Sequence, residues 1–134
     1  MIKEIGHIGI CVYSIDAMLE KLRDTVGAVE TDRVVIPELG QISSYVQIGE
    51  RGDTLELMEP LGETGVVADF LKKRGEGIHH ISLHSDKAET ELAALEGQGC
   101  RIIGRSQGVG FTHPKTMHGV LFEVVDDTYG SSKE

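Results

Sequence analysis

The chain has 134 residues, of which 40% are apolar and 26% charged, a composition ordinary for one soluble globular domain. Its formal net charge of −9 argues against a surface that follows nucleic-acid phosphates, so no nucleic-acid partner is expected. No run approaches the ~20 apolar residues of a membrane span, and no basic-then-apolar secretory signal opens the chain. We therefore expect a cytoplasmic protein with no membrane partner. Cys11 and Cys100 are isolated and predict free thiols.

The first part of the chain predicts a strand, a helix and three further strands. Residues 5–12 alternate, with Ile8 and Ile10 on the face opposite His7. Ser14 or Asp16 can cap a helix that ends at about residue 26. Strand-like segments follow at residues 30–36, 43–48 and 54–58.

The second part repeats this order after a connector at about residues 60–77, which holds a short helix at residues 66–73. A strand is expected at residues 78–84, a helix at residues 88–96 capped by Asp86, and strands at residues 101–105, 110–113 and 119–125. The fold class is therefore α+β, with two βαβββ repeats forming a curved mixed sheet around a metal-containing cavity. A single domain is expected over residues 1–134, with repeat one at about 4–59 and repeat two at about 78–126.

Each repeat opens with a histidine on a strand and closes with a glutamate on another strand. These four residues are His7, Glu56, His80 and Glu123. Imidazole nitrogens and carboxylate oxygens suit divalent ions such as Zn, Ni, Co, Mn or Fe, so the four predict one shared metal site. A single histidine on a strand is more often a hydrogen-bonded or solvated side chain. Four such residues at equivalent positions favour the metal interpretation.

Two neighbours compete with these ligands. His79 adjoins His80, and Glu59 lies three residues after Glu56. By alternation both point to the opposite face, so they are predicted to have structural roles.

Several longer stretches resemble the vicinal oxygen chelate superfamily of glyoxalases, bleomycin resistance proteins and dioxygenases. Within it, the resemblance is to the methylmalonyl-CoA epimerase family over residues 5 to 125. The stretches that carry it are His7-Ile8-Gly9-Ile10, Leu55-Glu56-Leu57-Met58-Glu59-Pro60-Leu61-Gly62, Val67-Ala68-Asp69-Phe70-Leu71-Lys72-Lys73, Gly75-Glu76-Gly77-Ile78-His79-His80-Ile81, His113-Pro114-Lys115 and Gly119-Val120-Leu121-Phe122-Glu123.

The resemblance implies an isomerase that interconverts the 2R and 2S forms of methylmalonyl-CoA or a close acyl-CoA. It implies that His7, Glu56, His80 and Glu123 bind one divalent ion (Co, Ni, Mn or Zn), which stabilises the enolate formed when the α-proton leaves. Glu123 is the matched base. A homodimer is also expected from the family.

One position departs from the family pattern. Some members carry a second glutamate three residues after a glycine, whereas this chain has Ser43 after Gly40. Serine is a poor general base at neutral pH without an activating partner. Ser43, Tyr45, Gln47, His113 and Lys115 are the predicted substrate-binding residues.

Two alternatives remain open at this point. One is a glyoxalase I-type lactoylglutathione lyase or isomerase, which the missing second glutamate favours. The other is a protein of the same fold that binds a small molecule without turnover.

Overall fold

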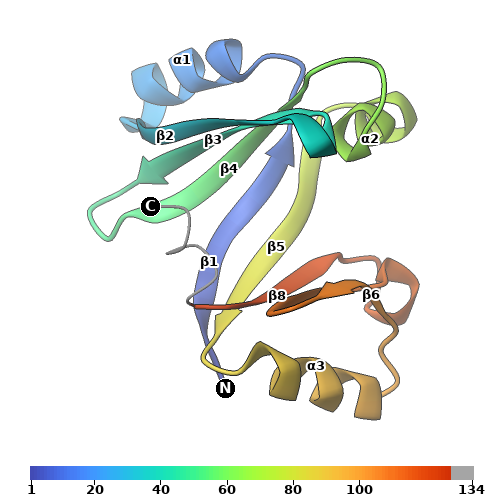
Figure 1. Ribbon diagram of the computed structural model, residues 1–134. Helices are drawn as coiled ribbons and strands as arrows, with labels where there is room; N and C mark the ends of the chain where they lie inside the picture. Colours follow the sequence, from blue (N-terminus) through green and yellow to red (C-terminus); the bar gives the residue numbers. More distant parts are fainter. Residues whose placement is uncertain (128–134) are drawn as a thin grey trace. The chain divides into compact units, whose positions relative to one another are not determined.

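The computed structural model describes residues 1–127, and its elements repeat one order (Figure 1). The first repeat contains β1 (Ile2–Cys11), α1 (Ile15–Val26), β2 (Val29–Ile36), β3 (Gln41–Ile48) and β4 (Asp53–Pro60). After α2 (Val66–Arg74), the second contains β5 (Gly77–Ser85), α3 (Ala88–Gly97), β6 (Ile102–Ser106), β7 (Val109–Thr112) and β8 (Phe122–Asp126). The predicted α+β class with two βαβββ repeats is confirmed.

The described residues form two compact units, the first of residues 7–79 and the second of residues 1–6 and 80–127. Strands β1 and β5 contribute residues to both. The prediction of one domain over the whole chain stays a prediction.

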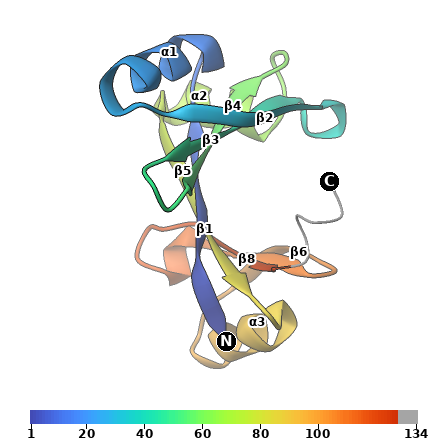
Figure 2. The ribbon, with the colours of Figure 1, turned by 90° about the vertical axis from the view of Figure 1, so that its left-hand side faces the viewer.

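In the first unit, β1 pairs in parallel with β4, and β3 lies antiparallel between β4 and β2. Helix α1 covers one face of these strands (Figure 2). The core on that face consists of Val12, Ile15, Leu19, Ala28, Val46 and Leu57. A second cluster, of Cys11, Met58, Val67 and Leu71, lies beneath α2.

Local sequence sets both ends of α1. Ser14 has an extended backbone, and its hydroxyl accepts a hydrogen bond from the backbone N–H of Ala17, as expected of an N-cap. Gly27 is left-handed, with φ of 70°, and closes the helix through bonds to carbonyls of its last turn. The predicted cap at Ser14 is confirmed.

In the second unit, β5 pairs in parallel with β8, and β7 lies antiparallel between β8 and β6. Helix α3 packs on these strands through Ala88 and Leu92, which form a cluster with Val124 of β8, and all three are fully buried. The predicted cap of this helix is wrong. Residue Lys87 occupies the N-cap without a side-chain bond, and Asp126 of β8 accepts the bond from the backbone N–H of Ala88.

The last strand also begins later than the sequence predicts, at Phe122 rather than at residue 119. A 3-10 turn at Pro114–Thr116 precedes it, and both His118 and Gly119 have positive φ. This left-handed backbone interrupts strand geometry, so the segment before Phe122 is a loop.

No helix within residues 1–127 is long and apolar enough to cross a bilayer. Cys11 and Cys100 are free thiols, as predicted.

Candidate metal and substrate site

In the first unit, His7 and Glu56 lie on neighbouring parallel strands and point to the same face. Gly9 is the register partner of Glu56, and His7 is two residues before Gly9, so alternation puts both side chains on one side of the sheet. The Nε2 atom of His7 lies 3.2 Å from Oε1 of Glu56, and both side chains are largely buried. The alternation argued from sequence is correct for this pair.

The other carboxylate oxygen of Glu56 is held by β3. The hydroxyl of Ser43 donates a hydrogen bond to Glu56 Oε2 at 2.8 Å. The side-chain amide of Gln41 donates in turn to Ser43 Oγ at 3.0 Å. All three residues are buried. Ser43 therefore touches a predicted ligand directly, a contact that the sequence does not reveal.

The face that carries the predicted ligands also carries apolar side chains. Cys11 and Met58 share it with Glu56 and pack beneath α2. Burial, with a further contribution from the charge of Glu56, raises the pKa of the Cys11 thiol to about 12. At neutral pH this thiol stays protonated and belongs to the apolar surroundings of the carboxylate.

Two of the predicted substrate-binding residues lie on the same face of β3. Tyr45 is the register partner of Glu56, and its ring stands edge-on to the His7 ring with a centroid separation of 6.4 Å. Gln47 is exposed and lies against the turn at Gly52.

In the second unit, His80 and Glu123 share a face with Ser82 and Phe111. His80 is buried, and its ring meets Phe111 edge-on at 6.5 Å. Glu123 is half-buried and is the register partner of both Ser82 and Phe111. Among the described residues, the Ser82 hydroxyl is the buried side-chain polar atom that lacks a hydrogen-bond partner. Buried polar groups in native proteins are nearly always hydrogen-bonded, so this hydroxyl is an exception that calls for an explanation.

The remaining predicted residues, His113 and Lys115, lie at the 3-10 turn before β8. His113 Nδ1 accepts a hydrogen bond from the backbone N–H of Lys115 at 3.1 Å and caps the turn. The side chain of Lys115 is exposed. The geometry gives His113 a local structural role and leaves its role in substrate binding a prediction.

The two competing residues have structural contacts. His79 packs edge-on against Phe70 of α2 at 5.3 Å. Glu59 accepts a hydrogen bond from the backbone N–H of Ile15 at the start of α1. Neither shares the environment of the predicted ligands.

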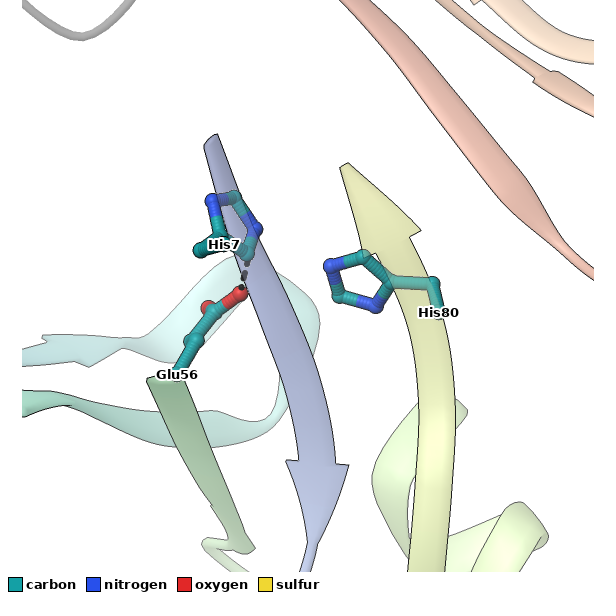
Figure 3. A group of neighbouring side chains, drawn as sticks. All are labelled: His7, Glu56 and His80. Carbon is teal, nitrogen blue, oxygen red and sulfur yellow. Dashed lines mark ion pairs between the residues drawn. The ribbon is translucent and has the colours of Figure 1, made fainter. Parts of the chain in front are cut away.

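His7, Glu56 and His80 form a group that could hold a metal ion, and Figure 3 draws their side chains. Glu123, the fourth predicted ligand, is not in this group of described residues. Two imidazoles and a carboxylate fit Zn, Co, Ni, Mn or Fe. The His7 nitrogen and the Glu56 oxygen that lie 3.2 Å apart are both atoms of the kind that coordinate such cations.

Comparison with known proteins identifies the family. The sequence signature of the Glyoxalase/Bleomycin resistance protein/Dioxygenase superfamily matches residues 6–117. The chain belongs to this superfamily.

Several of its relatives within the superfamily are named epimerases. The mitochondrial methylmalonyl-CoA epimerase of Dictyostelium discoideum is 30% identical, with 92% of this chain and 78% of that protein covered. The ethylmalonyl-CoA/methylmalonyl-CoA epimerase of Cereibacter sphaeroides is 29% identical, with 92% and 98% covered. A solved methylmalonyl-CoA epimerase in complex with methylmalonyl-CoA and NH4+ is 31% identical, with a TM-score of 0.84 and coverage of 96% and 97%. The predicted resemblance, fold and epimerase-like enzyme class are confirmed.

Proposed function

We propose that this chain is a metal-dependent epimerase that interconverts the 2R and 2S forms of methylmalonyl-CoA or a close acyl-CoA. The observation that carries the proposal is the group of His7, Glu56 and His80 in a chain that is similar to named epimerases of such substrates. The binding of methylmalonyl-CoA by a structural relative of nearly equal length supports the substrate class.

We propose His7, Glu56, His80 and Glu123 as the residues that hold one divalent ion, whether Co, Ni, Mn or Zn. Such an ion, when bound, supplies Lewis-acid stabilisation of the negative charge that develops on the substrate as its α-proton leaves. The side chains of the protein orient the acyl group and transfer the α-proton.

Glu123 is the proposed base. Its half-buried position leaves part of the side chain accessible, and a carboxylate can remove the α-proton from one face of the substrate. Inversion then requires a proton that another group or a water delivers to the opposite face. Tyr45 and Gln47 are the proposed substrate contacts on β3, and Lys115 offers an exposed cation for an acyl-CoA. A homodimer and a cytoplasmic location stay predictions.

The test is α-proton exchange by metal-loaded protein. Methylmalonyl-CoA of one configuration is incubated with the protein in deuterated water, and deuterium incorporation and epimer ratio are followed by NMR. We expect metal-dependent incorporation with interconversion of the epimers, abolished by EDTA and restored by one of the four ions. Absence of exchange with every ion would overturn the epimerase proposal and favour the glyoxalase-type alternative.

Two adjacent histidines provide a matched pair of variants. His80→Ala removes a proposed ligand, so both metal content and exchange should be lost. His79→Ala removes a ring that packs on Phe70, so metal content and exchange should be retained. Equal metal loss in both variants would contradict the assigned ligand.

A further inference from the structure

The hydroxyl of Ser43 lies between two other buried polar side chains. Gln41, Ser43 and Glu56 are 6%, 0% and 7% exposed. The distances along the chain of bonds are 3.0 Å from the Gln41 amide to Ser43 and 2.8 Å from Ser43 to the carboxylate. Side chains that are so buried exchange little with solvent, so each depends on the others for its hydrogen bonds.

The direction of these bonds follows from the chemistry of the groups. A serine hydroxyl has one proton to donate, and an ionised carboxylate can only accept. Ser43 must therefore donate to Glu56 and accept from the NH₂ group of Gln41. With the amide turned round, Ser43 would have to donate to both neighbours, which one proton does not allow.

This arrangement fixes the carboxylate of Glu56. One of its oxygens is committed to Ser43, and the other lies 3.2 Å from Nε2 of His7. We propose that Ser43, oriented by Gln41, is a positioning residue that presents Glu56 to a divalent ion through a single oxygen. The ion itself rests on the proposed function.

The same arrangement assigns Ser43 no part in proton transfer to the substrate. Its proton points to Glu56, and its oxygen accepts the Gln41 amide. Where the family resemblance implies a second base, this chain has a residue that orients a ligand. Removal of a residue that hydrogen-bonds to a metal ligand typically changes metal affinity or activity about 10–100-fold.

The chain provides a matched control in the next residue. Ser44 is equally buried, but it points to the other face of β3, where its hydroxyl bonds to Glu30. Removal of either hydroxyl creates a similar small defect in the same strand. Only the loss of the Ser43 hydroxyl should change the binding of the metal ion.

The experiment measures Co²⁺ binding to the EDTA-treated full chain by calorimetry, together with the visible spectrum of the bound ion. In Ser43→Ala we expect the Kd to rise about 10–100-fold and the spectrum to change as Glu56 reorients. Gln41→Met should act in the same direction by a smaller factor. Ser44→Ala should match the wild type in both measurements.

An unchanged Kd and spectrum in Ser43→Ala would overturn the positioning role, as would an equal change in Ser44→Ala. Ser43→Cys keeps the shape of the side chain but adds a bulkier atom with a weaker donor, so it tests the role if Ser43→Ala does not fold. A wild-type chain that binds no Co²⁺ would also overturn it. A wild type that binds Co²⁺ but exchanges no α-proton with any of the four ions would overturn the epimerase proposal alone.

Discussion

The two repeats place their glutamates in different surroundings. In the first unit, Glu56 is buried, bonded by Ser43 and adjacent to His7. In the second unit, Glu123 is half-buried beside an orphan hydroxyl, that of Ser82. Both are proposed metal ligands, and the greater accessibility of Glu123 suits its additional proposed role in proton transfer to a substrate. The duplicated pattern thus supports two different roles.

The two helices that cover the sheet strands differ in a similar way. A strand carboxylate accepts the first backbone N–H of each helix, Glu59 from Ile15 of α1 and Asp126 from Ala88 of α3. Helix α1 also has a local cap, Ser14, whereas Lys87 at the N-cap of α3 forms no side-chain bond. The start of α1 therefore has a local acceptor in addition to the tertiary one, and the start of α3 depends on the tertiary contact.

The largest effect is expected from substitutions that test the different roles of the two glutamates. Glu123→Gln keeps a ligand oxygen but cannot accept a proton, so α-proton exchange should fall about 10²–10⁴-fold. Glu56→Gln also keeps an oxygen, and its exchange rate should fall less. The two variants are compared by measuring their rates of deuterium incorporation at the same metal occupancy. Equal losses would mean that the two carboxylates share one role.

A second prediction concerns the close approach of β1 and β5 in the second unit. A Cβ on Gly6 would lie 2.0 Å from Nε2 of His84, whose ring also faces Glu4. Gly6→Ala should therefore lower the free energy of unfolding by about 1–3 kcal/mol. Denaturant unfolding measures this loss. Adding His84→Ala should recover most of it, and a failure to recover would place the strain in the backbone instead.

The smallest effect concerns the two helix caps. Asp126→Ala and Ser14→Ala should each lower the free energy of unfolding by about 1 kcal/mol, because each leaves a helix N–H without its acceptor. Asp126→Asn keeps an acceptor oxygen and should retain most of the stability. Thermal unfolding of the wild type and the three variants shows whether the tertiary cap contributes as much stability as the local one. A loss in Asp126→Asn as large as in Asp126→Ala would assign the effect to charge.

Much of the fold was readable from the sequence because its signals are local. The alternation around His7 and Glu56 correctly placed both on one face, and Ser14 correctly predicted the start of α1. The cap of α3 and the start of β8 were wrong. The first depends on Asp126, far along the chain, and the second on a left-handed turn at His118.

The sequence by itself determined the repeated element order, the residue types of the candidate site and the resemblance to the superfamily, because each depends on spacing along the chain. Only the tertiary structure decided what Ser43 does. Its hydroxyl meets Glu56 through the pairing of β3 with β4, and the direction of that bond depends on Gln41. Hydrogen bonds between strands join residues whose separation in sequence carries no periodic signal, so they become visible only when the sheet has formed.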